Sequence, residues 1–95
     1  MIDIAELHTA IMARLQAQYL PLLEIRMLGE SGLQFRVDGS KCLSNIGVWP
    51  NGCCDVEYLF AEAETGNFLH FEFGSVLEAV EPVVREIRAA LERAQ

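Results

Sequence analysis

Positive charge is scarce in this sequence. Seven Lys and Arg stand against fourteen Asp and Glu, giving a formal net charge of -7 and a pI of about 4.6. The few cations do not cluster as a phosphate-binding patch would, and an acidic chain is repelled by nucleic acid and by anionic membranes. We therefore expect neither as a direct partner. Long apolar runs are also missing, since none approaches the ~18–20 residues of a membrane span.

Metal-binding and disulfide patterns are missing as well. The three cysteines are Cys42, Cys53 and Cys54, with no Cys-x-x-Cys and no pair of histidines at ligand spacing. Neighbouring strand residues point to opposite faces, so Cys53 and Cys54 should not reach the same metal ion or bridge. We expect reduced thiols, no metal and no cofactor. Because residues 1–3 lack the basic start of a signal peptide, we expect a cytoplasmic protein, with residues 1–95 forming a single domain.

The stretch from Val48 to Glu57 is the most informative part of the chain, and it predicts two strands joined by a tight turn. Pro50, Asn51 and Gly52 suit a three-residue loop whose glycine is left-handed. Such a loop pairs Trp49 with Cys53 and gathers the apolar residues on one face. The opposite face then carries polar and aromatic residues: Trp49, Asp55 and Glu57.

Apolar periodicity and turn residues extend this reading along the chain. They predict a helix over residues 3–19, capped by Asp3 and stopped by Pro21, then strands over 22–28, 33–37, 42–49, 53–61 and 68–73. The turn before the last strand is placed at residues 64–67. A second helix runs from Ser75 to about Arg93, and Pro82 should kink it or split off its first turn. The predicted fold class is α+β: a five-stranded antiparallel meander with N- and C-terminal helices packed on one face, leaving the other face open.

Strand parity then selects the candidate site. The predicted pairing aligns Glu57 with Glu72 in one row and Leu59 with His70 in the next. Two carboxylates facing each other are unfavourable unless solvent screens them or a partner's Lys or Arg lies over them. The alternatives are an ordinary solvated face and a Trp49 ring packed against the turn. The residues predicted to bind a partner are Trp49, Asp55, Glu57, Glu72, His70 and Asn45.

These residues favour binding over catalysis. His70 near two acids could serve as an acid or base, but the predicted pairing places no nucleophile with a base beside it. A flat sheet also excludes little water. We therefore expect no enzymatic activity, with a small hydrolase or transferase using His70 as a further hypothesis.

A family resemblance strengthens the binding interpretation. The run Val48-Trp49-x-x-Gly52-x-x-Asp55-x-Glu57-x-Leu59, followed by Glu64-Thr65-Gly66 and an aromatic strand over residues 68–73, resembles bacterial immunity proteins of the TriTu type. The resemblance covers about residues 45–80. It implies a small cytoplasmic protein that neutralises the toxin of a contact-dependent growth-inhibition or other polymorphic toxin system. It implies as partner the C-terminal domain of a cognate toxin, which in such systems is frequently a basic nuclease, often acting on tRNA.

A second interpretation belongs to another class. Small acidic secretion chaperones with α/β structure hold an effector segment as homodimers, but they usually place a helix between their strands, and this meander shows none. A homodimer of the chain stays open at this point.

Overall fold

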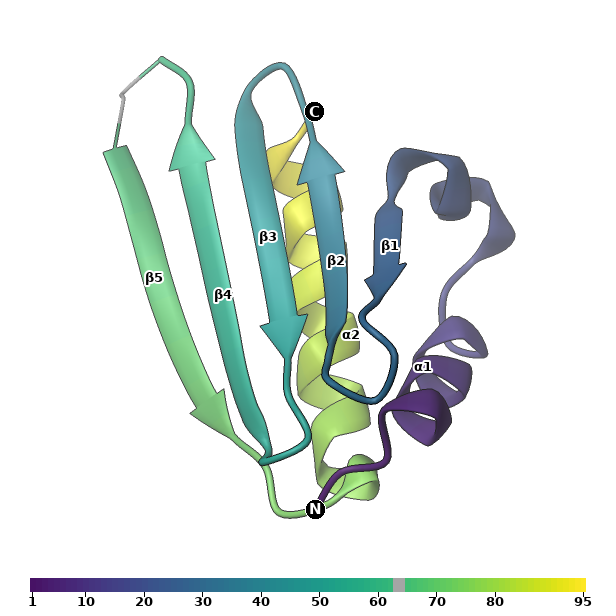
Figure 1. The fold of residues 1–95 in the computed structure, drawn as a ribbon. Coiled ribbons are helices and arrows are strands. Elements are labelled where there is room, and N and C mark those ends of the chain that lie inside the picture. Colours follow the sequence, from purple (N-terminus) through teal and green to yellow (C-terminus); the bar gives the residue numbers. More distant parts are fainter. Residues whose placement is uncertain (63–64) are drawn as a thin grey trace.

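In the computed structural model, which describes residues 1–62 and 65–95, five strands cross one antiparallel sheet in the order β1-β2-β3-β4-β5 (Figure 1). The strands are β1 (Glu24–Met27), β2 (Leu33–Asp38), β3 (Cys42–Val48), β4 (Cys53–Phe60) and β5 (Thr65–Glu72). The helices are α1 (Ile4–Met12), the 3₁₀ helix η1 (Ala17–Leu22) and α2 (Val76–Arg93). Figure 1 shows α2 behind β2 and β3, and α1 beside β1. The predicted α+β meander with terminal helices is confirmed.

The core lies between the helices and the middle of the sheet. Phe35, Ile46 and Val56 face inward from three adjacent strands and are almost completely buried. Opposite them, α2 buries a stripe at helical spacing, made up of Ala79, Val83, Val84, Ile87, Ala90 and Leu91. One polar group enters this layer. The guanidinium of Arg93 lies 3.9 Å from the Tyr58 ring centroid and donates to the hydroxyl of buried Ser44.

The first helix is shorter than predicted. Asp3 caps it as expected, its carboxylate accepting from the backbone N–H of Glu6 at 3.0 Å. However, α1 ends at Met12, and Pro21 lies inside η1 instead of stopping a helix that runs to residue 19. The residues beyond α1 still reach the core without continuing the helix: Leu15 is buried, and Tyr19 and Leu20 of η1 pack against the core.

The turn between β3 and β4 is confirmed in detail. The N–H of Trp49 donates to the carbonyl of Cys53 at 3.0 Å, and Gly52 has a φ of +92°. The Asn51 side chain accepts from the Cys53 N–H at 3.0 Å. Val48 therefore lies opposite Cys54, as the three-residue loop predicts. This end of the sheet is fixed by local hydrogen bonds.

The predicted pairing of β4 with β5 is wrong by four residues. Glu57 lies opposite Phe68 instead of Glu72, and His70 lies opposite Asp55 instead of Leu59. Residues 65–67 belong to β5 and not to the turn placed at 64–67, of which residue 64 lies outside the described residues. Because a slip of four is even, every side chain keeps its predicted face.

The last helix begins as predicted and runs through its proline. The Ser75 hydroxyl accepts from the N–H of Glu78, whose carboxylate accepts from the N–H of Gly74 at 2.9 Å. Pro82 does not split α2, which is continuous from Val76 to Arg93. Burial of the helix face on both sides of Pro82 offsets the one backbone hydrogen bond that proline removes.

The helices do not cover the inner face of the sheet to its edges. Leu69 on β5 and Met27 on β1 lie opposite buried Val56 and Leu33 on the inner face, yet they are 38% and 44% exposed. The core is therefore narrower than the sheet. None of the helices in the described residues combines the length and the apolar character that crossing a bilayer requires.

Candidate functional site

The face of the sheet opposite α2, called the open face below, presents four rows of side chains. Each row consists of residues that lie opposite one another on neighbouring strands. Three rows run across the sheet from β2 to β5, and the fourth runs from Trp49, in the β3–β4 turn, to β5. In order along the strands, ending at the Trp49 turn, the rows are Asp38-Leu43-Leu59-Gly66, Arg36-Asn45-Glu57-Phe68, Gln34-Gly47-Asp55-His70 and Trp49-Cys53-Glu72. All six residues predicted to bind a partner lie on this face.

Charge is divided unevenly across the open face. On β1 and β2 the charges pair with one another: Arg36 lies 3.4 Å from Asp38, and Arg26 lies 3.8 Å from Glu24. Glu24 lies opposite Arg36 in the pairing of β1 with β2, although these two residues make their ion pairs with other partners. By contrast, β4 and β5 contain no Lys or Arg. The acidic excess of the open face is therefore concentrated on these two strands.

The acids of β4 and β5 surround His70 instead of facing each other. The Nδ1 atom of His70 lies 2.6 Å from Asp55 Oδ1, and its Nε2 lies 4.0 Å from a Glu72 oxygen. Glu57 has no part in this cluster, so the predicted Glu57–Glu72 repulsion is absent. The cluster also includes the Cys53 thiol, which lies within 4.8 Å of ligand atoms of His70 and Glu72.

Trp49 is both packed and accessible. Its ring lies across Gly47, where an added Cβ would come within 2.7 Å of the indole Cη2, and its edge reaches Gly32. The residue is 39% exposed. Glycine at position 47 thus leaves room for the indole to lie flat on the open face. The indole presents a rigid apolar surface next to the His70 cluster, in keeping with its predicted role as an anchor.

A hollow in the opposite half of the open face was not predicted. Leu59 and Phe68 are 46% and 60% exposed there, and the absent side chain of Gly66 leaves space between them. The residues lining the hollow are Leu43, Asn45, Glu57, Tyr58, Leu59, Gly66, Asn67 and Phe68. Asn45 is one of these residues, and its Oδ1 atom is buried without a hydrogen-bond partner among the described residues.

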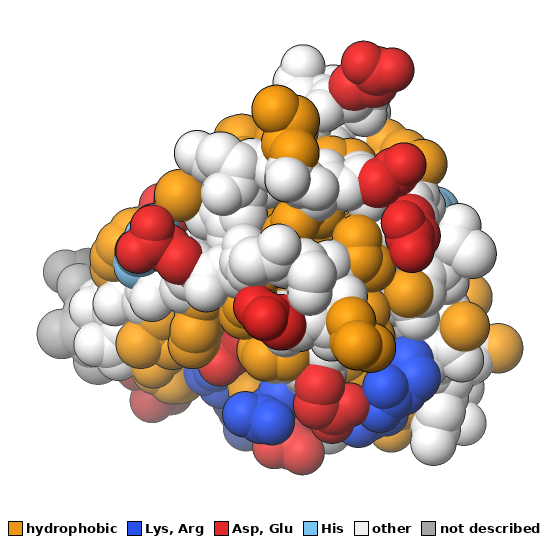
Figure 2. All heavy atoms as spheres, turned by 90° about the horizontal axis from the view of Figure 1, so that it is seen from below, with side chains coloured by type: hydrophobic (Ala, Val, Ile, Leu, Met, Phe, Trp, Pro, Cys, Tyr) orange, Lys and Arg blue, Asp and Glu red, His pale blue; other side chains and the backbone are white. Residues whose placement is uncertain are grey.

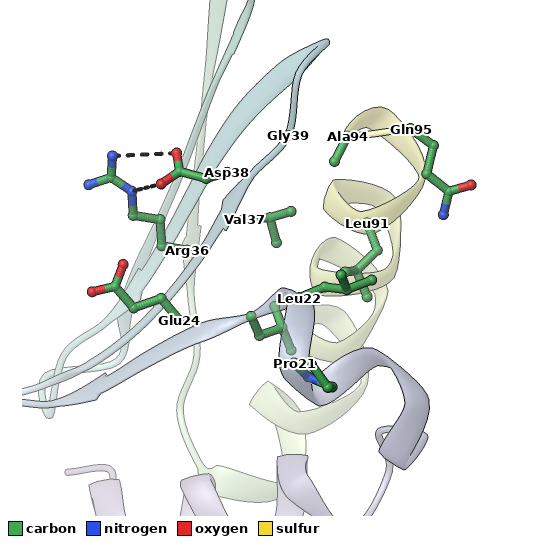
Figure 3. Close-up of a pocket in the computed structure, with 11 residues that line it drawn as sticks. Pro21, Leu22, Glu24, Arg36, Val37, Asp38, Gly39, Leu91, Ala94 and Gln95 are labelled. Carbon is green, nitrogen blue, oxygen red and sulfur yellow. Dashed lines mark hydrogen bonds and ion pairs between the residues drawn. The ribbon is translucent and has the colours of Figure 1, made fainter.

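A second hollow lies on the helix side of the sheet. Figure 3 shows Leu22, Val37 and Leu91 facing one another between η1, β2 and the end of α2. In the same view Arg36 and Asp38 point to the other side of β2, where they pair. Its walls are mainly apolar, and the charged residues at its lining, Glu24, Arg36 and Asp38, come from β1 and β2.

Three of the basic side chains, Arg14, Arg85 and Arg88, gather around Glu81 and not on the open face. Figure 2, a view from below, shows Lys and Arg along one edge, with acidic side chains spread among hydrophobic ones elsewhere. Around Glu81 the pairing is tight: the hydrogen bond and charge of Arg14, aided by Arg85 and Arg88, lower the pKa of the Glu81 carboxyl. These cations join α1 to α2 and do not offset the acids of the open face.

The thiols differ in environment. Burial, together with the negative charges of Asp55 and Glu86, raises the pKa of Cys54 to about 12, so this thiol stays protonated in the core. Cys53 lies on the other face, half-buried, beside His70. Sequence reasoning missed this neighbour because the predicted register placed His70 opposite Leu59, three rows from Cys53 instead of one. A predicted register that paired Asp55 with His70 would have placed His70 next to Cys53.

Comparisons with protein-family models, with curated proteins and with solved structures give no match for this chain.

Proposed function

We propose that this protein is an immunity protein, which neutralises a basic toxin domain by laying its open face over the toxin's active site or substrate groove. The observation that carries the proposal is the uncovered surface of β4 and β5. Asp55, Glu57 and Glu72 lie there without any Lys or Arg on the same strands. Exposed Leu59 and Phe68 adjoin them. Acids beside apolar anchors fit a partner whose functional surface is cationic.

The partner's chemistry follows from this surface. A nuclease that cleaves RNA, such as a tRNase, binds phosphates with Lys and Arg, and the same cations would pair with these carboxylates. The net charge of -7 favours rapid capture, since opposite charges steer association to rates near ~10⁸ M⁻¹s⁻¹. Such an inhibitor acts in the cytoplasm, needs no cofactor and contacts neither nucleic acid nor membrane itself.

The resemblance over residues 45–80 points to the same function. The motif residues Trp49, Asp55 and Glu57 lie together on the open face and not in the core. The chaperone-like alternative receives less support, because the described residues contain no helix between the strands. This alternative predicts a homodimer that holds an effector, and the experiment below would detect it.

The experiment begins with the tagged protein expressed in its native organism, followed by mass spectrometry of what co-purifies. We expect a stoichiometric basic domain whose expression alone arrests bacterial growth, and whose toxicity the wild-type protein abolishes. A recovered self-dimer, or an effector that is not toxic, would instead identify the chaperone-like function.

Two matched variants then test the surface. Replacing Asp55, Glu57 and Glu72 by their amides removes three charges from the open face. Replacing Glu6, Glu30 and Glu92 by their amides removes the same number of charges elsewhere, since these three residues are exposed and lie outside the five strands. Growth protection should fail only in the first variant. Equal protection by both would exclude the open face as the inhibitory surface.

A further inference from the structure

Three side chains of different ligand type converge at one end of the open face. Sγ of Cys53, a ring nitrogen of His70 and a carboxylate oxygen of Glu72 all lie within 4.8 Å of one another. They come from two adjacent strands, with Cys53 directly opposite Glu72 and His70 two residues earlier on β5. We infer that these three residues form a site for a thiophilic divalent cation of the zinc type.

The histidine is already oriented for this task. Its Nδ1 lies 2.6 Å from Asp55 Oδ1, so Nδ1–H donates to the carboxylate and leaves Nε2 as the ring nitrogen with a free lone pair. Nε2 is the atom on the side of Glu72, 4.0 Å from its oxygen. Metal-binding histidines typically donate their other nitrogen to a carboxylate, which fixes the tautomer and the ring. Asp55 is therefore a positioning residue.

The backbone beneath the cluster is held on both strands. The N–H of Cys53 donates to the Asn51 side chain, and the N–H of Phe73 donates to the carbonyl of Gly52 at 2.8 Å. These bonds fix the first residue of β4 and the end of β5, just beyond Glu72. Rigid strand ends favour a preorganised ligand set.

The remaining adjustment is small. Ligands at ~2.0–2.3 Å from a tetrahedral zinc ion lie about 3.4–3.8 Å from one another, so the three atoms must close by about 1 Å. The side chain of Glu72 is 79% exposed and free to rotate by that amount. The fourth position stays open to water, since three protein ligands lie at the surface. A mixed sulfur, nitrogen and oxygen set favours zinc over Mg²⁺ or Ca²⁺, which prefer oxygen alone.

This inference does not rest on the proposed toxin partner, because the cation needs only the residues of this chain. The test uses the reduced, metal-free full chain without any partner. Zn²⁺ affinity is measured by competition with a chromophoric chelator, and Co²⁺ is added in parallel to give a spectrum. We expect one equivalent of metal and a near-ultraviolet thiolate-to-cobalt charge-transfer band.

Variants identify the ligands. Cys53→Ser should abolish the charge-transfer band, and both it and His70→Ala should weaken zinc binding at least tenfold. Asp55→Ala should keep the band but weaken binding about 10–100-fold, the range found for groups that orient a metal ligand. These three changes lie at the surface, and circular dichroism checks that each variant is folded.

The chain offers matched controls. Cys42→Ser changes a buried thiol whose neighbours are a carbonyl and the Ser44 hydroxyl, so serine suits that place. His8→Ala removes the other histidine, which lies on α1. Both should bind metal like the wild type. The inference is overturned by a wild-type protein with no thiolate band, or by affinity that is lost in the controls and kept in the Cys53 and His70 variants.

Discussion

Replacing Gly52 by alanine tests the junction that aligns β4 with β5. Gly52 has a φ of +92°, and an added Cβ would lie 2.0 Å from the carbonyl oxygen of Phe73. Placing alanine in this left-handed conformation costs about 1–2 kcal/mol. The end of β5 must also move away, which breaks the hydrogen bond from the Phe73 N–H to the Gly52 carbonyl and costs about 1 kcal/mol more. We expect a loss of about 2–3 kcal/mol in the free energy of unfolding.

Gly29 supplies the matched control. Its φ is +63°, and an added Cβ would meet nothing within 4 Å. Gly29→Ala therefore carries the backbone penalty without the clash, and it should cost about 1–2 kcal/mol. Urea denaturation followed by circular dichroism gives both values. In a chain of this length the Gly52 variant should also melt about 10 °C or more below the wild type.

The difference between these two variants isolates the contact with Phe73. Equal losses for Gly52→Ala and Gly29→Ala would show that β5 does not approach the turn as described. The register of β4 and β5, and with it the grouping of Cys53, His70 and Glu72, would then be wrong.

Three further predictions concern single residues. Cys53 should react with a thiol reagent in the native protein, whereas the two buried cysteines should react only on unfolding, as mass spectrometry of alkylated peptides would reveal. Arg14→Ala should raise the pKa of Glu81, which an NMR titration of the carboxyl group would follow. Because folding lowers this pKa, the ion pair stabilises the protein at a pH above the pKa of Glu81 in the unfolded chain, and the stabilisation is lost as the pH falls through the pKa of the folded protein. Gly47→Ala should lift the single tryptophan, Trp49, off the open face, and its emission should shift to the red; an unchanged spectrum would contradict the packing described.

The sheet was predictable because alternation leaves little freedom. In β2 apolar and polar residues alternate strictly, and in β3 Ile46 and Val48 keep the same parity, so a one-residue slip would expose the core. At the β3–β4 turn, loop length and Gly52 agreed with that pattern. Each local preference supported the same pairing, so the open face and the position of Asp55 on it followed from the sequence.

The register of β5 was not predictable in the same way. Gly66 and Asn67 have turn chemistry, so the turn was placed there, but strand pairing extends to Thr65. The observed register moves Phe71 from opposite Tyr58 to opposite buried Cys54, where it packs against the core. Tertiary packing thus overrode a local turn signal. Since both registers keep the same faces, alternation could not separate them.

Proline did not decide where the helices end. The sequence placed the end of the first helix at residue 19, before Pro21, but α1 ends at Met12 and Pro21 lies inside η1, whose Tyr19 and Leu20 still pack against the core. In α2, Val83 and Val84 directly after Pro82 are buried, and the helix is continuous from Val76 to Arg93. The split that Pro82 could have caused is therefore absent, because packing of the helix face offsets the lost hydrogen bond.

The most direct test of the central claim is the dissociation constant of the purified complex with its toxin domain, measured with a chelator present to exclude metal. Three proteins are compared: the wild type, the variant with amides at Asp55, Glu57 and Glu72, and the control with amides at Glu6, Glu30 and Glu92. Loss of paired interface charges costs about 3 kcal/mol or more, so the open-face variant should bind at least ~100-fold more weakly. The control should bind within a few fold of the wild type. Equal weakening of both variants, or of neither, would contradict an inhibitory surface on β4 and β5.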